Sequence, residues 1–310
     1  SDRKKQIING IQGTEKYPLF NPGQDIHFRT KEELSIRYQL TKAQYDASPV
    51  AHRQVIEVEG TKIGYLAYLS FDYLYDEDLL AALGELAAEG AQEFILDLRI
   101  NRGGSVNSAA LLCSALMPQT LEGKTLCTLV RNPRNQVSQQ QSTFSLSDTG
   151  SIFSLDNLTV ICSNYSASAS ELVVMGLRGL DVPVMLIGSQ TEGKNCGMDV
   201  SRKKINGREY EYAPITFMCL NAKGVGDWGE GVAPDVDLTE DNSFGVSDAH
   251  YPIPRADWGD EHHDIALAVA LADITGRGIS AKTRSVAYSD LATMTTQRPS
   301  IGGLKIFVEE

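Results

Sequence analysis

Three serines alternate with alanines in residues 166–171, SASASE, and a glutamate closes the motif. Ser168 and Glu171 fit the S-x-x-E capping box, in which the two side chains satisfy main-chain amides at a helix start. The same place also suits a nucleophile, because the unpaired amides and the dipole of a helix N-terminus stabilise an anion. Capping and nucleophilic attack compete for the same hydroxyl, so the rest of the chain must decide between them.

Two other short segments could supply the remaining parts of an acyl-transfer site. Gly103 and Gly104 form a pair that either makes a tight turn or exposes amides to a developing oxyanion. Lys194 is either a solvated loop lysine or a general base whose pKa is lowered by apolar surroundings. A hydroxyl, an amine and paired amides together would suffice to cleave a carbonyl compound.

The elements that must position these residues follow an alternating pattern. Continuous apolar runs over 93–100, 158–164 and 182–189 predict buried strands, and helical spacing predicts helices over 76–91, 107–117 and 170–180. Runs at 55–59, 63–71 and 124–132 predict further strands. This order predicts an α/β domain with a mainly parallel sheet, in which neighbouring strands end at one edge. The glycine pair, the serine motif and Lys194 each follow such a strand end.

Other segments read differently. Asn206-Gly207 between two alternating runs predicts a β-hairpin within 199–220. Residues 136–151 are poor in apolar side chains and predict an exposed loop or flap, while 34–41 predicts a strand. An amphipathic pattern predicts a helix over 262–278.

The composition excludes several classes of protein. The 310-residue chain has a net charge of −12 and no basic stripe, which argues against nucleic-acid and anionic-membrane binding. Its five cysteines form no C-x-x-C pair and predict buried free thiols without a metal site. No stretch approaches the length of a membrane span. We therefore expect no cofactor, no metal and no membrane-spanning segment.

Four motifs in register resemble the S41 serine peptidases, the carboxy-terminal processing or tail-specific proteases. DLRINRGG (97–104) resembles their D-L-R-x-N-x-G-G motif, SASASE their nucleophile motif, GK (193–194) their lysine motif and GVAPDV (231–236) their G-[IV]-x-P-D segment. The resemblance covers roughly residues 54–275. It implies a ClpP/crotonase-like spiral of βαβ units, here with an added antiparallel hairpin region.

The resemblance also implies roles. Ser168 would be the nucleophile, with Ser166 and Ser170 structural, and Lys194 would be the general base of a Ser-Lys dyad. The oxyanion hole would use the amide of Ala169 and a glycine amide, Gly103 in preference to Gly104. The implied function is a serine endopeptidase that cleaves extended peptides or unfolded protein tails through an acyl-enzyme.

Two departures leave the third catalytic residue unassigned. Many family members have a glutamine four residues after the lysine, where this chain has Met198. Some have an aspartate about eleven residues after the nucleophile, where this chain has Gly179, and Asp181 nearby is the candidate orienting residue. A catalytically inactive peptide-binding protein on the same fold is therefore the alternative.

The resemblance also frames domains and location. It implies a peptidase domain over 51–275, a C-terminal extension over 276–310 and an N-terminal segment, 1–50, that could be the remnant of a PDZ-like domain. The usual location of the family implies the bacterial periplasm or cell envelope, with a lipid anchor supplied by a segment outside this chain.

A Ser-Asp-His hydrolase would need a G-x-S-x-G elbow, which does not surround Ser168. The acidic and histidine residues at 261–264 open a helix, so we expect no catalytic role for them.

Overall fold

The structure is a computed structural model that describes residues 48–134, 139–147, 152–238 and 257–276, together with strands β1 and β2. The chain divides into two compact units, residues 1–47 and 48–310. In the first unit, β1 (Asp25–Arg29) pairs with β2 (Ser35–Gln39) in antiparallel fashion. The strand predicted over 34–41 is thereby confirmed. The predicted extension over 276–310 lies outside the described residues beyond Gly276.

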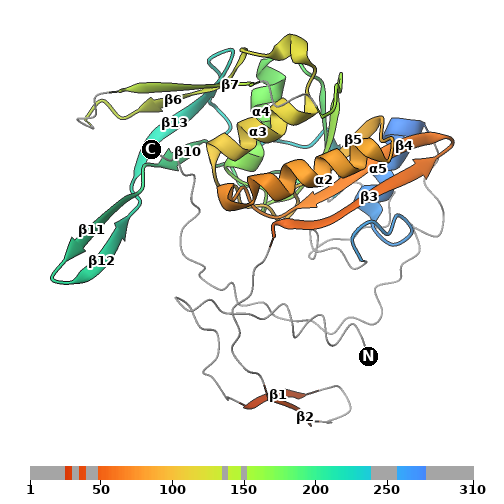
Figure 1. The fold of residues 1–310 in the computed structure, drawn as a ribbon, viewed down its shortest axis with the longest axis horizontal. Helices are drawn as coiled ribbons and strands as arrows, with labels where there is room; N and C mark the ends of the chain where they lie inside the picture. The colour runs from red at the N-terminus through yellow and green to blue at the C-terminus, as the bar shows by residue number, and fades with distance from the viewer. Residues whose placement is uncertain are drawn as a thin grey trace. The chain divides into compact units, whose positions relative to one another are not determined.

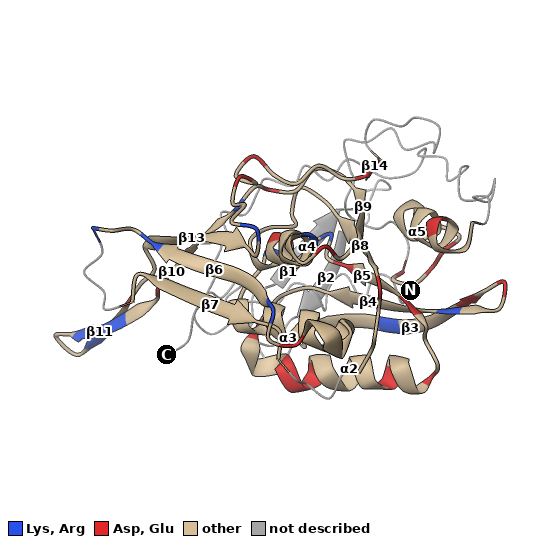
Figure 2. Ribbon diagram, turned by 90° about the horizontal axis from the view of Figure 1, so that it is seen from above, with Lys and Arg blue, Asp and Glu red and all other residues tan. Residues whose placement is uncertain are grey.

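The second unit, drawn in Figure 1, is built on a six-stranded sheet. Its strands, labelled in Figure 2, follow the order β14-β9-β8-β5-β4-β3. The strands are β3 (Val50–Val58), β4 (Thr61–Tyr68), β5 (Glu93–Asp97), β8 (Leu158–Cys162), β9 (Val184–Gly188) and β14 (Val236–Asp237). All neighbours are parallel except β3 and β4, which form a hairpin. The mainly parallel sheet is therefore confirmed.

Both faces of this sheet are covered, because side chains that alternate along β4 enter two different cores. Leu66 and Tyr68 pack in the larger core, with apolar side chains of α2 (Asp76–Ala88), α3 (Val106–Leu116) and α4 (Ala169–Gly179). Ile63 and Tyr65 pack in the smaller core with α5 (Ile265–Thr275). Two short 3₁₀ turns, η1 (Tyr73–Tyr75) and η2 (Gln119–Leu121), adjoin α2 and α3.

A second, antiparallel sheet in the order β10-β13-β6-β7 corrects two expectations. It contains β6 (Thr125–Arg131), β7 (Gln141–Ser145), β10 (Cys196–Met198) and β13 (Ile215–Asn221). The strand predicted over 124–132 is β6, so it lies in this sheet and not in the parallel one. The loop or flap predicted over 136–151 contains β7, whose half-buried Phe144 pairs with Cys127 of β6. An edge strand with one buried face needs few apolar residues, which is why its composition read as a loop.

The hairpin predicted around Asn206-Gly207 is confirmed as β11 (Ser201–Ile205) and β12 (Arg208–Tyr212). Asn206 and Gly207 both have positive φ, 49° and 77°, as a type I′ turn requires. These two strands form a sheet of their own and project from the second sheet (Figures 1 and 2).

The helix predicted over 262–278 is shorter at both ends and spans Ile265–Thr275. Asp264 caps its start by accepting from the amides of Ala266 and Leu267, and Gly276 ends it in the left-handed conformation. All five cysteines are free, and all but Cys196 are buried, as expected. Within the described ranges, every helix is too short or too polar to cross a bilayer.

Candidate active site

The three loops that carry the predicted site residues meet at one edge of the parallel sheet. They follow β5, β8 and β9, which are adjacent and parallel. Arg102, from the glycine loop, lies 3.8 Å from the carboxylate of Glu192 in the lysine loop and 5.7 Å from the ring centre of Tyr165 in the serine loop. The expected convergence is thus confirmed.

Ser168 has an unusual backbone and an uncommitted hydroxyl. It lies between β8 and α4 with φ 64° and ψ −116°, a conformation that a non-glycine residue adopts only under strain. The residue is 1% exposed, and within the described part of the chain its Oγ has no hydrogen-bond partner. Ser168 and Glu171 are placed as in a capping box, but of its two hydrogen bonds only the one to the glutamate is formed. The Ser168 amide donates to the Glu171 carboxylate at 2.8 Å. The Oγ is therefore not held as a cap.

The two neighbouring serines differ, because their hydroxyls are committed. Ser166 Oγ donates to the Leu98 carbonyl at 2.8 Å and accepts from the Ser163 amide at 2.9 Å. Ser170 Oγ donates to the carbonyl of Asn101 at 3.0 Å. Both serines thus fasten the serine loop to the strand end after β5, as residues with the structural role implied by the resemblance would do.

Glu171 connects the serine loop to the lysine loop. Its buried carboxylate accepts from the amides of Ser168, Gly193 and Lys194, each at 2.8 Å, and from Thr191 Oγ1 at 2.5 Å. Four donors compensate the cost of burying a charged carboxylate. The sequence indicated Glu171 only as a helix cap, and its contacts across to residues 191–194 had no local signal.

Lys194 is half-buried at the end of this loop. Burial lowers the pKa of its ammonium below the ordinary value, and the nearby Arg102 guanidinium lowers it further. Cys196, Cys219 and Glu171 oppose this shift without cancelling it. In the described residues, no hydrogen bond joins the Lys194 amine to Ser168 Oγ.

Gly103 packs directly against the serine, whereas Gly104 packs against the backbone of Phe71. A Cβ on Gly103, whose φ is +92°, would lie 2.6 Å from the Ser168 Cβ and 2.8 Å from the amide nitrogen of Ala169. The Gly103 amide itself donates to the side-chain oxygen of Asn101 at 2.8 Å. By contrast, the amides of Gly104 and Ala169 have no hydrogen-bond acceptor within the described residues. Ala169 follows Ser168 directly and Gly104 follows Gly103, so both of these amides, unpaired within the described residues, belong to the loops that meet here.

Asn101 holds this arrangement from behind. Its side-chain amide donates to the Tyr68 carbonyl at 2.9 Å, and its own carbonyl accepts from the amide of Ala167 at 3.2 Å as well as from Ser170. One fully buried asparagine thus links the end of β4, the glycine loop and the serine loop. The only sequence signal for it was its place in the DLRINRGG motif.

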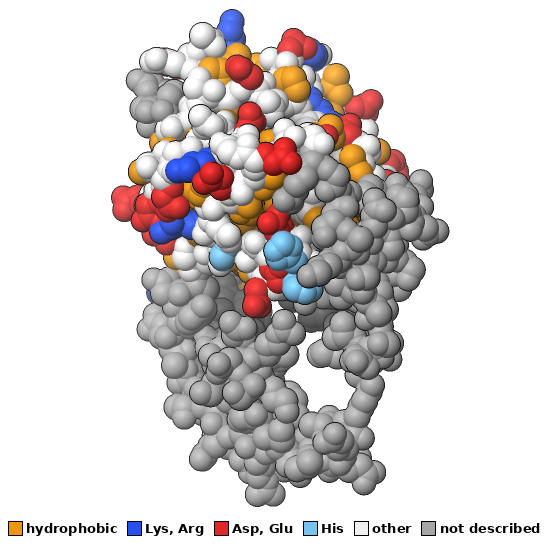
Figure 3. Space-filling model, turned by 90° about the vertical axis from the view of Figure 1, so that its right-hand side faces the viewer, with side chains coloured by type: hydrophobic (Ala, Val, Ile, Leu, Met, Phe, Trp, Pro, Cys, Tyr) orange, Lys and Arg blue, Asp and Glu red, His pale blue; other side chains and the backbone are white. Residues whose placement is uncertain are grey.

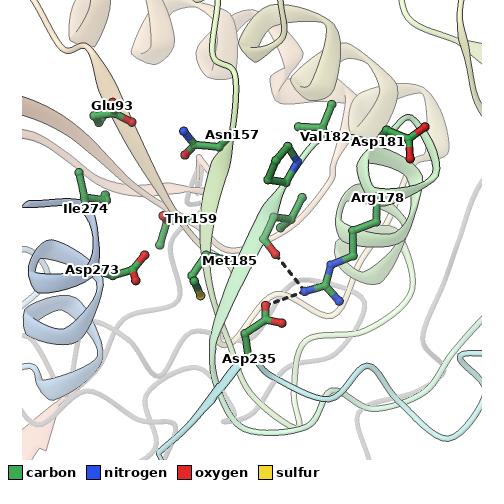
Figure 4. A pocket seen from close by; sticks show the side chains of 12 residues that line it. Glu93, Asn157, Thr159, Arg178, Asp181, Val182, Met185, Asp235, Asp273 and Ile274 are labelled. Carbon is green, nitrogen blue, oxygen red and sulfur yellow. Dashed lines mark hydrogen bonds and ion pairs between the residues drawn. The ribbon is translucent and has the colours of Figure 1, made fainter. Parts of the chain in front are cut away.

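The structure does not bring Asp181 to this edge. Asp181 follows the C-terminal end of α4, and Ser168 precedes its N-terminal end; 11 helical residues span about 16 Å. The Asp181 side chain is 81% exposed and pairs with Lys223. It lines an open pocket of about 670 Å³ at the opposite ends of β8 and β9 (Figure 4). There Arg178 bridges the Val184 carbonyl and Asp235.

The two positions at which the family resemblance implies an orienting residue hold Met198 and Gly179 here, and neither has a polar side chain. Met198 is buried in β10. A Cβ on Gly179 would lie 2.9 Å from the Asn221 side chain, so that position is filled by packing. Neither position therefore supplies the carboxylate or side-chain amide that could orient the Lys194 amine.

Asp97 and Arg99 are structural, as expected, and Asp264 completes their network. The Arg99 guanidinium donates to the Asp97 carboxylate at 2.6–3.0 Å and to the Asp264 carboxylate at 2.7–3.0 Å. All three side chains are buried, and Tyr65 donates to Asp97 at 2.8 Å. The network ties the strand end before the glycine loop to the start of α5.

His262 and His263, near Asp264, are exposed. Figure 3 shows pale-blue histidine side chains beside acidic ones on one face of the molecule. His263 contacts Asp260 at 2.7 Å and its side chain is 59% exposed. Among the described residues, no group of three or more His, Cys, Asp or Glu side chains could hold a metal ion.

Comparisons with known proteins agree with this geometry. The chain is 32% identical over 149 residues to carboxyl-terminal-processing peptidase 1, chloroplastic, from Arabidopsis thaliana, covering 47% of this chain and 28% of that protein. A Bacteroides fragilis structure assigned to the S41 proteases superposes with a TM-score of 0.64 at 22% identity, covering 81% of this chain and 65% of that one. A photosystem II D1 C-terminal processing protease gives a TM-score of 0.50 at 22% identity, covering 71% and 56%.

The fold is thus the ClpP/crotonase-like fold of these proteins. The chain spans less than half the length of the curated relatives that it matches. The model of the peptidase family S41 matches residues 62–238, more than half of the chain. This protein therefore belongs to peptidase family S41.

Proposed function

We propose that this protein is a serine endopeptidase that cleaves extended peptides or unfolded protein tails, with Ser168 as nucleophile and Lys194 as general base. The observation that supports this most is the Ser168 hydroxyl, which has no hydrogen-bond partner within the described residues, on a strained backbone next to the unpaired amide of Ala169. A buried hydroxyl without a partner costs stability, so its retention here favours a catalytic role.

The reaction follows from these groups. The neutral Lys194 amine takes the Ser168 proton while Oγ attacks the scissile carbonyl. The resulting oxyanion lies against the Ala169 and Gly104 amides at the positive end of α4. The tetrahedral intermediate collapses, the leaving amine takes the proton from the Lys194 ammonium, and the acyl group remains as an ester on Ser168. Water activated by Lys194 then hydrolyses this ester and regenerates the serine.

In the proposed mechanism Ser168 and Lys194 must approach one another when substrate binds, because no hydrogen bond joins them here. Hydrogen bonds between catalytic groups often form only in the substrate complex. Glu171 keeps the two loops together meanwhile, through the Ser168 and Lys194 amides. The Gly103 amide is engaged with Asn101, so we assign the glycine donor to Gly104 in preference to Gly103.

A catalytically inactive peptide-binding protein is the second candidate. It is favoured by the missing Ser168–Lys194 hydrogen bond and by Met198 at the position where relatives have an orienting glutamine. The family resemblance further suggests an exported location, in the bacterial periplasm or cell envelope, which fractionation of the native host would test.

The deciding experiment compares hydrolysis of an unstructured protein such as casein by the wild type and by Ser168→Ala. We expect cleavage by the wild type, new carboxyl termini by mass spectrometry, and loss of at least 10³-fold in the variant. A mechanism-based serine reagent should label Ser168 and no other serine. Equal and negligible rates for both proteins would favour the binding protein.

A further inference from the structure

The hairpin of β11 and β12, called the arm here, stands apart from the body of the protein. It forms a two-stranded sheet of its own and continues from β10 and β13 (Figures 1 and 2). All of its residues are exposed except Glu211, which is partly buried. A two-stranded hairpin without a core is only marginally stable by itself. Burial of apolar side chains therefore does not explain the arm, and we ask what its exposed side chains could bind.

One face of the arm neutralises its own charges. The register pairs Arg202 with Glu211 and Lys204 with Glu209 across the strands. Arg202 Nε donates to the Glu211 carboxylate at 3.2 Å. Directly opposite residues share a face, so this side of the arm carries two cations and two carboxylates.

The other face, called the tyrosine face here, has no such balance. It carries the cross-strand pairs Ser201–Tyr212, Lys203–Tyr210 and Ile205–Arg208. Tyr210, Tyr212 and Ile205 are 42%, 45% and 44% exposed. Two cations therefore stand beside two aromatic rings and an isoleucine without a carboxylate on the same face, in a chain whose net charge is −12.

We propose that the tyrosine face binds an acidic, unfolded segment of the protein substrate. Lys203 and Arg208 complement aspartate and glutamate side chains, and the rings offer apolar contact and a polar edge. Because β11 and β12 pair only with each other in the described part of the chain, each also offers a free edge to an extended strand. The arm thus selects substrates by charge.

The position of the arm in the chain favours a substrate over other partners. β10 begins at Cys196, the second residue after Lys194, and leads directly into the arm. The arm and the proposed base therefore belong to one continuous stretch of the chain, so a substrate segment bound to the arm is held by the same stretch that carries Lys194. The inference rests on the proposed peptidase function for its biological meaning, although binding itself can be measured without hydrolysis.

The test uses the full chain with Ser168→Ala, which prevents cleavage, and two labelled unstructured peptides. One peptide has glutamate at alternate positions, and its partner has glutamine there. We expect the acidic peptide to bind more tightly by fluorescence anisotropy, with a difference that shrinks at 0.5 M salt. Lys203→Gln with Arg208→Gln should weaken acidic-peptide binding about 5- to 10-fold, as the loss of two ion pairs predicts.

The opposite face supplies a matched control. Arg202→Gln with Lys204→Gln removes the same charge from the same hairpin, and we expect at most a twofold change. Tyr210→Ser with Tyr212→Ser should weaken binding of both peptides. Circular dichroism and thermal unfolding of each variant exclude loss of the fold as the cause.

Three results would overturn the proposal. The parent could bind both peptides equally, or the two charge variants could behave alike. Alternatively, sedimentation could show that the tyrosine-face variant dissociates an oligomer of the parent, which would make the arm a contact between copies. Absence of any hydrolysis by wild type together with arm-dependent peptide binding would instead refute the peptidase function and leave the assigned ligand standing.

Discussion

The carboxylate of Glu171 accepts a hydrogen bond of 2.8 Å from the main-chain amide of Lys194. A second bond of the same length reaches it from the amide of Ser168. The two residues proposed to exchange a proton are therefore held by a single buried anion, although their own side chains are not hydrogen-bonded. Glu171 fixes where the loops lie and leaves the last approach of the side chains to substrate binding.

Replacing Glu171 with glutamine should separate the loops. An amide offers one acceptor oxygen, and its NH₂ group would face main-chain donors, so at least one buried amide loses its partner. We expect a loss of about 2–4 kcal/mol in the free energy of unfolding and about 10²-fold in kcat. Urea unfolding and steady-state peptidolysis measure the two effects. If Glu171 is only a helix cap, the folded variant should retain wild-type kcat.

Backbone strain at Ser168 predicts that activity and stability oppose each other there. Glycine adopts φ 64° without penalty, so Ser168→Gly should raise the free energy of unfolding by about 1 kcal/mol while abolishing hydrolysis. Ser170→Ala is the comparison, because it deletes a hydroxyl that is hydrogen-bonded to Asn101 and should destabilise instead. A destabilised Ser168→Gly would mean that the conformation is not strained.

The close contact between Gly103 and Ser168 predicts that no side chain is tolerated at position 103. Gly103→Ala would place a methyl group 2.6 Å from the Ser168 Cβ at φ +92°. We expect a cost of about 2–4 kcal/mol and loss of activity. Thermal unfolding and peptidolysis are the measurements.

Gly60 provides the control for this substitution. Its φ is +83°, and a Cβ there would meet nothing within 4 Å. Gly60→Ala should therefore cost only the backbone term of about 1–2 kcal/mol and leave kcat unchanged. Similar losses in both variants would show that the contact with Ser168 has no effect of its own.

The buried ion network of Asp97, Arg99 and Asp264 predicts that a substitution outside the proposed catalytic residues strongly lowers the free energy of unfolding. Asp264→Ala removes a buried partner of Arg99 and the cap of α5, and we expect a loss of about 3–5 kcal/mol. Asp260→Ala removes only exposed contacts, with the His263 side chain and the His262 amide, and should cost less than about 1 kcal/mol. Chemical denaturation of the two variants in parallel would refute this reading if their midpoints moved equally.

Short sequence patterns were enough to predict the strands and turns that depend on interactions between residues close together in the chain. The buried strands before Asn101 and Ser166 and the Asn206-Gly207 turn were all predicted, because apolar runs and turn residues act over a few positions. The membership of β6 in the antiparallel sheet was missed, since pairing with β7 and β13 depends on partners far along the chain. Asp181 was chosen by its distance in sequence from Ser168, but α4 carries it away from the site. Contacts such as Glu171 with Lys194 exist only once two loops have folded together.

The lowered pKa of Lys194 predicts an activity that rises with pH. The neutral amine is the active form, so the rate should increase as the ammonium loses its proton and then level off. Because burial and Arg102 shift that pKa downward, the rise should end at a lower pH than for an exposed lysine. Arg102→Gln removes one positive neighbour and should move the rise to higher pH. The same change at Arg53, at the far edge of the sheet, should leave the profile in place. Profiles of kcat/KM against pH for the three proteins measure this, and a rate controlled by a group titrating near pH 6 would instead implicate a histidine.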